Sequence, residues 1–311
     1  MKDKLIVSVS PHLSAPDETP KIMWLVSLSL IPAGLASVFI FGLASLWIVL
    51  ACVLCAVATE AVIQKLCGKA VTIYDGSAAL TGLLLGYCLP PRVPLWMAAV
   101  GAIVAIAIGK QVFGGLGQNI FNPALVGRAF IMVAWPTQMT TWIKPGLAWQ
   151  FDAVSSATPL ANNFVQTSLW ELLIGNRGGS IGEVCVLALL IGGLFLLITG
   201  LISWQIPAVF LATVGLLTWV FAGENYFSGA WLQHILSGGL ILGAFFMATD
   251  YVTSPLTHKG KLIFGFGCGL FTAIIRIWGG YPEGTCYAIL LMNAATPMID
   301  RYTPPKKFGT C

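Results

Sequence analysis

Residues 45–64 read SLWIVLACVLCAVATEAVIQ, a stretch of twenty residues in which Glu60 is the only charge. About 20 mostly apolar residues are needed to cross the hydrocarbon core of a bilayer. The backbone of such a segment must be helical, because only a helix satisfies its own hydrogen bonds there. This stretch therefore predicts a transmembrane helix.

The same criterion, applied outward along the chain, predicts about ten spans. They cover residues 22–41, 45–64, 76–90, 94–113, 119–135, 182–202, 206–222, 233–249, 262–278 and 284–300. Several are short, which favours tilted or broken helices. We therefore expect an all-α polytopic membrane protein with one long outer loop. Its parts are an amino-terminal segment 1–21, a five-helix repeat 22–135, the loop 136–181, a second five-helix repeat 182–300 and a tail 301–311.

The composition excludes a soluble enzyme. The 311 residues are 57% hydrophobic and 9% charged, whereas soluble chains carry about 25% charged residues. The net charge of +4 reports membrane orientation rather than a nucleic-acid partner. Six of the eight cysteines lie in apolar runs, where a thiol usually behaves as a small hydrophobe. We predict neither a disulfide framework nor a metal site, and we expect the amino terminus to stay uncleaved.

The distribution of Lys and Arg predicts the orientation. With ten spans both termini lie on one side, and that side collects Lys2, Lys4, Lys21, Lys65, Lys69, Lys110, Lys259, Lys261, Arg301, Lys306 and Lys307. The other side has only Arg92, Lys144 and Arg177. Because positive charge accumulates on the cytoplasmic side, we expect both termini inside and the loop 136–181 outside.

An internal repeat appears when the second half is laid on the first with a shift of 165 residues. Phe113-Gly114-Gly115 then meets Trp278-Gly279-Gly280, and Pro90 meets Pro255. Five spans in each half would make the second half enter the membrane from the opposite side. The sequence therefore predicts an inverted five-plus-five repeat with a site or pathway near the midplane.

The predicted outer loop contains Asp152-Ala153-Val154-Ser155-Ser156-Ala157-Thr158-Pro159-Leu160. Small and hydroxyl residues gather there in a chain otherwise built of aliphatic and aromatic residues. Asp and Ser offer capping oxygens, and Pro159 disfavours a helical backbone at Thr158. From these properties alone the segment is an extracellular turn or a helix start.

This string resembles the D-x-x-[ST]-[GS]-A-T signature at which a flavin transferase joins FMN to Thr through a phosphoester. The whole chain resembles the family formed by the D subunits of Rnf electron-transport complexes and the B subunits of sodium-translocating NADH:quinone reductases. Further matches are Ser10-Pro11-His12, Ile22-Met23, residues 75–82 (DGSAALTG) and residues 114–124 (GGLGQNIFNPA). The short amino terminus points to the Rnf branch. Ser156 stands where many relatives have Gly, and the signature admits either residue.

The resemblance implies covalent FMN on Thr158, with Asp152, Ser155, Ser156 and Ala157 completing the attachment motif. It further implies a subunit of a redox-driven ion translocase in a bacterial or archaeal cytoplasmic membrane, without catalytic activity of its own. The electron-transport complex would couple electron flow between ferredoxin and NAD to movement of Na⁺ or H⁺. The expected partners are other Rnf subunits, including a second covalent-flavin subunit and membrane iron–sulfur subunits, and a flavin transferase for maturation.

The approach to the fifth span predicts a second site. Gly114 and Gly115 precede Asn119 and Asn122, and a glycine turn at a helix start exposes backbone donors that suit an anion or the polar edge of a flavin. Together with Arg128 these residues are candidates for a second, non-covalent flavin or riboflavin, or for an ion route. Close packing of the two halves is the alternative for the glycines. No strand precedes them, which excludes a dinucleotide fold.

Ionisable residues inside spans are costly and therefore candidates for function. They are Glu60, Asp75, Lys110, Arg128, Asp250 and Arg276. We expect Lys110 and Asp250 to reach the membrane interface, and Arg128 and Arg276 to form internal pairs or to contact a flavin. The oxygens of Thr81, Ser77, Asp75 and Glu60 suit a sodium ion.

Two other functions remain open at this stage. An inverted repeat with glycine-rich half-helices also suits a urea-channel-like channel or a secondary transporter without redox function. The subunit could also serve mainly as a scaffold. The hydroxyl-rich outer loop distinguishes the redox interpretation, because a channel has no need of it.

Overall fold

The computed structural model describes residues 19–143, 155–156, 160, 168–223, 225–279 and 283–304, and it is almost entirely helical. The first half contains α1 (Thr19–Ser29), α2 (Ile31–Phe41), α3 (Leu43–Leu66), the 3-10 turn η1 (Ile73–Asp75), α4 (Ser77–Tyr87), α5 (Leu95–Ile106), the π-helical turn η2 (Ala107–Gln111) and α6 (Pro123–Ala134). The connection contains α7 (Pro136–Met139), β1 (Trp142–Ile143), β2 (Ser155–Ser156) and α8 (Leu169–Ile174). The second half contains α9 (Val186–Ile198), α10 (Gln205–Phe221), α11 (Trp231–Ile235), α12 (Leu240–Leu242), the π-helical turn η3 (Gly243–Met247), α13 (His258–Trp278) and α14 (Thr285–Tyr302).

The helices present apolar side chains outward, as membrane helices do. Phe39 is 87% exposed, Leu54 66% and Ile198 84%. Among the described residues, three helical segments are long and apolar enough to cross a bilayer: Thr19–Phe41, Leu43–Leu66 and His258–Trp278. Shorter apolar helices accompany them. The fold is that of a helical polytopic membrane protein, whereas the count of ten spans stays a prediction.

Two predicted spans are broken. The span 22–41 divides into α1 and α2 at Leu30. The span 233–249 divides into α11, α12 and η3, and the break falls at Gly238 and Gly239, whose φ angles of 66° and 65° lie in the left-handed region. Since residues with a Cβ rarely adopt this conformation, the glycine pair ends one helix and starts another at a different angle. Broken helices in a membrane require protein or water around the exposed backbone.

The two halves repeat in the order of their elements. The 165-residue shift carries α3 onto α10, α4 onto α12 with η3, α5 with η2 onto α13, and α6 onto α14. This order agrees with the internal repeat that the sequence predicts. The inverted orientation of the second half stays a prediction.

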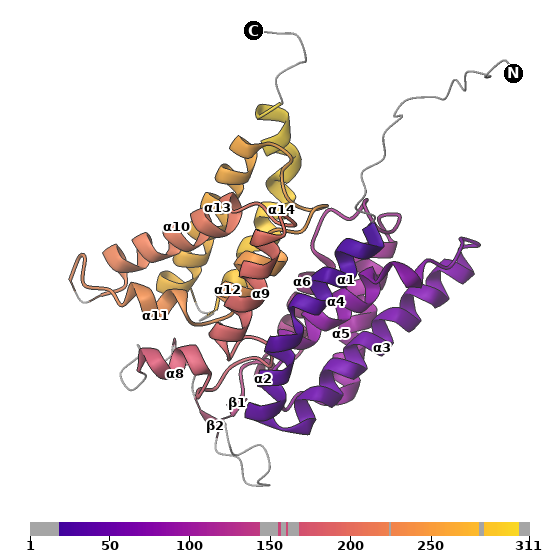
Figure 1. Ribbon diagram of the computed structural model, residues 1–311, viewed down its shortest axis with the longest axis horizontal. Coiled ribbons are helices and arrows are strands. Elements are labelled where there is room, and N and C mark those ends of the chain that lie inside the picture. The colour runs from indigo at the N-terminus through magenta and orange to yellow at the C-terminus, as the bar shows by residue number, and fades with distance from the viewer. Residues whose placement is uncertain are drawn as a thin grey trace, which may run out of the picture.

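The halves meet along two lines in the centre of the molecule, where α9 lies beside α1 and α2, and α14 contacts α6 (Figure 1). On α9, a Cβ at Gly192 would come within 2.2 Å of the carbonyl oxygen of Ser29. In the other seam, the backbone N–H of Asn122 donates to Oδ1 of Asn293 at 3.3 Å. Small residues and amides therefore let the two halves approach closely.

The connection between the halves lies at one end of the molecule. Figure 1 shows β1, β2 and α8 at the lower end, while α1 begins and α14 ends toward the upper end. The two strands pair antiparallel, with Trp142 opposite Ser156 and Ile143 opposite Ser155. The predicted loop 136–181 thus contains short elements of its own.

Candidate functional site

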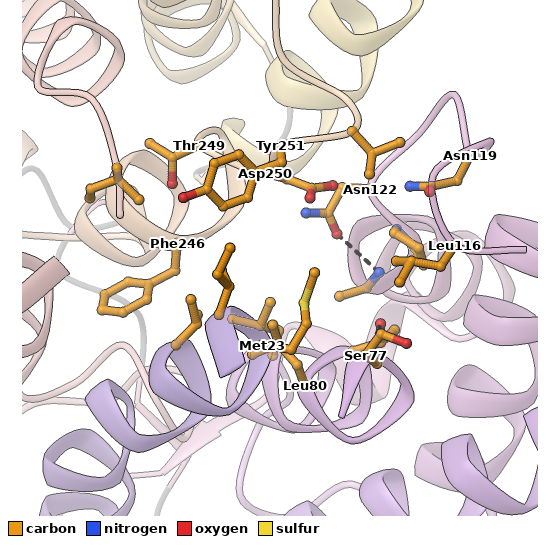
Figure 2. Close-up of a pocket in the computed structure, with 18 of the residues that line it drawn as sticks. Met23, Ser77, Leu80, Leu116, Asn119, Asn122, Phe246, Thr249, Asp250 and Tyr251 are labelled. Atoms are coloured by element: carbon orange, nitrogen blue, oxygen red, sulfur yellow. Dashed lines mark hydrogen bonds between the residues drawn. The ribbon is translucent and has the colours of Figure 1, made fainter. Parts of the chain in front are cut away.

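A central cavity, partly open to the surface, lies between the halves. Figure 2 shows residues from both halves around it, with Asn119, Asn122 and Ser77 from the first half and Thr249, Asp250 and Tyr251 from the second. Met23, Leu80 and Phe246 add apolar side chains. The cavity therefore combines several oxygen and amide groups with apolar walls.

A buried ion pair forms one wall of this cavity. Nζ of Lys110, in η2, lies 2.8 Å from both carboxylate oxygens of Glu60 on α3. It also donates to Oγ of Ser77 at 2.6 Å. Gln64 and Gln111 each donate to Oε1 of Glu60 at 3.1 Å. Lys110 is 2% exposed and Glu60 1%, so the expectation that Lys110 reaches the interface is wrong.

The π-helical turn accounts for the position of Lys110. A π-turn inserts one residue into a helix and rotates the following side chains, and such turns often occur at functional sites. Gly109 packs so closely that a Cβ there would lie 2.9 Å from Cα of Pro123. The turn thus directs Lys110 inward, toward Glu60.

Asn122 starts α6 at the meeting point of the two halves. Its Oδ1 accepts from the N–H groups of Ala124 and Leu125 at 3.1 and 3.4 Å, an N-cap that satisfies donors at the helix start. Its Nδ2 donates to the carbonyl of Met247 in η3 at 3.3 Å. Asn119 and Asn122 both line the cavity, and their role in binding a second flavin or an ion stays a prediction.

The remaining residues of that predicted site lie elsewhere. Gly114 and Gly115 do not line the cavity, and α6 begins only at Pro123. The carbonyl of Gly114 accepts from Nζ of Lys69 at 3.1 Å, and both glycines have positive φ angles, 122° and 112°. They therefore form a turn before α6 rather than the helix start, and their role in binding a flavin or an ion stays a prediction.

Arg128 belongs to a second buried charged cluster, the outer charge cluster. It consists of Arg128 on α6, Arg177 and Glu183 before α9, Arg276 on α13 and Glu283 before α14. Nη1 of Arg128 lies 2.9 Å from Oε1 of Glu183, and Nη2 pairs with Oε2 of Glu283. Arg128 thus forms the internal pair that was one of its two expected roles.

The other two arginines of the outer charge cluster bind backbone carbonyls. Nη2 of Arg177 donates to the carbonyls of Glu183 and Leu236 at 3.2 and 2.8 Å. Arg276 donates to four carbonyls, those of His234, Ser237, Gly238 and Glu283. No carboxylate of the described residues lies within ion-pair distance of either guanidinium. The cluster therefore holds three guanidinium groups and two carboxylates.

The predicted flavin-attachment motif is described only in part. Asp152, Ala157 and Thr158 lie outside the described residues, and Ser155 and Ser156 are described only as strand β2. Opposite Ser156 lies Trp142, which lines a small cavity together with Arg128 and Glu283. Ser156, the last described residue before Thr158, therefore pairs with a residue that lines a cavity beside the outer charge cluster.

The described residue after the motif, Leu160, lies on another face of the cluster. It lines a cavity with Arg177, Glu183, Gly238 and Glu283. A Cβ at Gly238 would meet Cδ1 of Leu160 at 2.5 Å. Thus Ser156, within the predicted motif, pairs with Trp142, and Leu160, after it, lines a cavity with members of the outer charge cluster.

Sequence reasoning missed three members of this cluster. Glu183 falls inside the predicted span 182–202, so the rule that identified Arg128 also applies to it. Glu283 lies one residue before the span 284–300, and Arg177 was counted only for orientation. Their assembly depends on the fold, because four separate segments bring them together.

The comparisons with known proteins agree along the whole chain. Residues 6–309 match the model of the NQR2, RnfD, RnfE family. The chain is 50% identical to the D subunit of the proton-translocating ferredoxin:NAD(+) oxidoreductase complex of Clostridium ljungdahlii, over 99% of this chain and 97% of that protein. It is 48% identical to the D subunit of the Na(+)-translocating complex of Acetobacterium woodii, over 98% and 95%.

A third relative, the D subunit of the ion-translocating oxidoreductase complex of Stutzerimonas stutzeri, is 41% identical over 93% of this chain and 92% of that protein. The matches extend through both halves and the connection between them. The resemblance inferred from short motifs is therefore confirmed over the full fold. The chain belongs to the NQR2, RnfD, RnfE family.

Proposed function

We propose that this chain is the D-type membrane subunit of an ion-translocating ferredoxin:NAD oxidoreductase complex. Relatives that are 48 and 50% identical over nearly their whole lengths carry that description. A subunit of this kind works with partner subunits that supply the ferredoxin and NAD sites. The other Rnf subunits, including a second flavin subunit and iron–sulfur subunits, are accordingly its partners.

The observation that carries the redox role is the attachment motif at residues 152–158. In the proposed maturation, the hydroxyl oxygen of Thr158 attacks the FMN phosphorus of FAD. The Thr–O–P bond forms, the P–O–P bond breaks, AMP leaves, and the hydroxyl proton is lost without any redox change. A flavin transferase supplies this chemistry.

The bound flavin would exchange electrons with centres on neighbouring subunits, because flavins accept electrons singly or in pairs. We place its loop on the outer side and both termini in the cytoplasm, in a ten-span inverted repeat. Two observations support this orientation: the excess of Lys and Arg on the side of the termini, and the position of β1, β2 and α8 at the opposite end (Figure 1).

The central cavity is the proposed ion route, with a second non-covalent flavin or riboflavin as the alternative occupant. Ser77, Thr81, Asn122 and Asp250 contribute oxygen atoms to it, and oxygen ligands suit Na⁺. The charge pair of Lys110 and Glu60 adjoins the same wall. Because one close relative is described as proton-translocating and another as Na(+)-translocating, similarity alone favours neither ion.

The test is in-gel fluorescence of the denatured protein under ultraviolet light after co-expression with a flavin transferase. The wild-type band should fluoresce, and Thr158→Ala should abolish the signal because the acceptor oxygen is lost. Thr158→Ser keeps a hydroxyl and should retain part of the fluorescence. Thr141→Ala removes an exposed hydroxyl beside β1 that donates to the carbonyl of Thr137 and should leave the band bright. A fluorescent Thr158→Ala band would refute the assignment.

A further inference from the structure

Arg128 lies between two cavities on one face of α6. Ala124, Arg128 and Met132 are spaced by four residues, so their side chains follow one another along the same face of the helix. Ala124 lines the central cavity, whereas Arg128 and Met132 line a second cavity beside Trp142, the β1 cavity. The two cavities, of about 70 and 30 Å³, each have room for more than one water. Arg128 therefore lies at the boundary between them.

The two cavities lie toward opposite ends of the molecule. The central cavity is lined by Met23 in the first half of α1 and by Tyr251 after η3, and α1 begins toward the end where α14 stops (Figure 1). The β1 cavity is lined by Trp142 and by Thr140, which is exposed. Figure 1 shows β1 at the other end of the molecule. A path that follows α6 from one cavity to the other therefore passes Arg128.

Two ion pairs hold Arg128 at this boundary. Its Nη1 lies 2.9 Å from Oε1 of Glu183, which precedes α9. Its Nη2 pairs with Oε2 of Glu283, which precedes α14. The exposed fractions of the three residues are 4, 4 and 8%. The guanidinium thus joins α6 to two segments that are distant from it in the chain.

The side chains around these ion pairs are closely packed. Sγ of Cys286 lies 3.5 Å from the carbonyl oxygen of Leu125, so α14 contacts α6 one turn before Arg128. Glu183 packs against the helix break before α12, since a Cβ at Gly239 would clash with its carboxylate. The boundary between the two cavities therefore consists of the Arg128 ion pairs and of packed side chains.

The charges at this boundary oppose the passage of a cation. An arginine in a pore repels protons and other cations. In its present position Arg128 also neutralises Glu183 and Glu283, the two groups that would otherwise attract a cation. If the pairs separated, the positive charge would leave the path and the two carboxylates would face it. Formation and separation of the pairs would therefore close and open the boundary to cations.

The other two arginines of the outer charge cluster hold the glutamates without using their carboxylates. Nη2 of Arg177 donates to the backbone carbonyl of Glu183 at 3.2 Å. Nε of Arg276 donates to the backbone carbonyl of Glu283 at 2.9 Å. Both backbone positions thus have contacts that do not depend on Arg128. Movement of the Arg128 side chain would leave the two glutamates in place.

We propose that the ion pairs of Arg128 with Glu183 and Glu283 form a gate between the central cavity and the β1 cavity, which opens when the transported cation passes. This inference rests on the proposed ion route through the central cavity. Transporters built from inverted repeats open a central site to one side of the membrane at a time. Because the pairs are formed in this structure, the gate is closed and the central cavity is shut toward β1.

The experiment measures whether a thiol in the central cavity can be reached from the β1 end. The parent protein, assembled in its complex, carries Thr249→Cys in the central cavity together with Cys67→Ser, Cys286→Ser and Cys311→Ser. Membrane vesicles are prepared in the orientation in which Thr141→Cys, at an exposed position beside β1, is labelled from outside. A small, membrane-impermeant cationic methanethiosulfonate is added outside, and mass spectrometry follows the labelled fraction. The same protein without Thr249→Cys gives the background.

Three variants of the parent protein are compared with it. In Arg128→Gln we expect Thr249→Cys to be labelled about tenfold faster from the β1 end, because loss of both ion pairs favours the open arrangement. Arg128→Lys keeps the charge but loses the fork that holds two carboxylates, so its rate should be intermediate. Arg92→Gln removes an exposed positive charge that lines neither cavity and should label at the parent rate.

The outcomes separate the gate from the ion route. Suppose that Arg128→Gln labels from the β1 end no faster than the parent, while vesicles of the opposite orientation still label Thr249→Cys. The gate would then be overturned and the ion route would stand. Labelling from neither face in any variant would overturn both, because the cavity would be closed to water. If Arg128→Gln does not fold, Glu283→Gln decides, since it weakens one pair, and a rate equal to the parent's would contradict the gate.

Discussion

Lys110 shows at the residue scale how a charge within an apolar helix is stabilised. Its Nζ contacts both oxygens of Glu60 and the hydroxyl of Ser77. The amides of Gln64 and Gln111 complete the surroundings of the carboxylate. Because each member of this network has a partner, the charges are tolerated in a buried position.

Removing one partner should therefore be costly. We expect Lys110→Met to destabilise the protein by about 3–5 kcal/mol, since it leaves Glu60 buried without its cation. The double variant, Glu60→Gln with Lys110→Met, should lose less stability than the sum of the losses in the two single variants. Thermal unfolding in detergent measures both. The control is Lys69→Met, which replaces an exposed lysine. If Lys110→Met is as stable as this control, the ion-pair network does not stabilise the fold.

Glu283 gives the outer charge cluster a pH dependence. Burial raises the pKa of Glu283 from its ordinary 4.5 to about 7, although Arg128 acts in the opposite direction. In the unfolded protein Glu283 loses its proton near pH 4.5, whereas in the folded protein it keeps the proton up to about pH 7. Between these two pH values the unfolded state therefore binds fewer protons. The free energy of unfolding should therefore fall as the pH rises from about 4.5 to about 7.

The check is the difference in melting temperature between wild type and Glu283→Gln, measured across that pH range. Glutamine has no proton to lose, so wild type should lose stability relative to the variant as the pH increases. Curves that run parallel would show that Glu283 does not titrate in this window.

At the scale of elements, the contact between α3 and α4 depends on the absence of a side chain at Gly82. A Cβ there would lie 2.7 Å from the carbonyl oxygen of Cys52 and from Cα of Val53. Both are backbone atoms that cannot move aside without shifting a helix. Small residues of this kind allow membrane helices to pack closely.

We predict that Gly82→Val destabilises the bundle by about 1–3 kcal/mol through overpacking. Ala58→Val, at an exposed position on α3, adds a comparable volume toward the outside and should be nearly neutral. The melting temperatures of the two purified variants provide the comparison. Equal values would mean that α3 and α4 do not meet at Gly82.

Sequence patterns predicted the elements better than the contacts between them. The apolar runs located α3, α10 and α13 closely, because the length of a membrane span is set by the bilayer. They did not predict the breaks at Leu30 and at Gly238, since hydropathy does not register a change of helix direction. They also did not predict the π-turn that directs Lys110 inward, because that turn packs closely against α6 at Pro123.

The same distinction holds for the candidate site. The attachment motif is a local string, and it was found in the sequence. The outer charge cluster was not, because Arg128, the segment holding Arg177 and Glu183, and Glu283 are distant from one another in the chain and meet only in the fold. Long-range charge pairing of this kind leaves no fixed spacing in the sequence.

At the scale of the whole molecule, the outer charge cluster and the central cavity are lined by different residues. Trp142 of β1 lines a cavity with Arg128 and Glu283 of the outer charge cluster, and Figure 1 shows β1 at the lower end of the molecule. The central cavity lies between the halves (Figure 2). Seams at Gly192 and Asn122 join the halves around that cavity. The proposed flavin and the proposed ion route would thus occupy different parts of one bundle.

The proposed orientation can be tested with thiols at the two ends. Cys67, just after α3, is exposed, and Thr141→Cys would place a second thiol beside β1. Both proteins carry Cys311→Ser. In right-side-out vesicles, a membrane-impermeant maleimide should label the thiol introduced by Thr141→Cys but not the thiol of Cys67. Permeabilised vesicles should label both. Labelling of Cys67 in intact vesicles would contradict the proposed orientation.

The most direct test of the central claim is mass spectrometry of the peptide that contains Thr158, after co-expression with a flavin transferase. The account predicts a peptide heavier by FMN less one water, with fragment ions that place the added mass on Thr158. The same peptide from Thr158→Ala should lack the adduct. An unmodified wild-type peptide, obtained while a known substrate of the transferase is labelled in the same cells, would contradict the account.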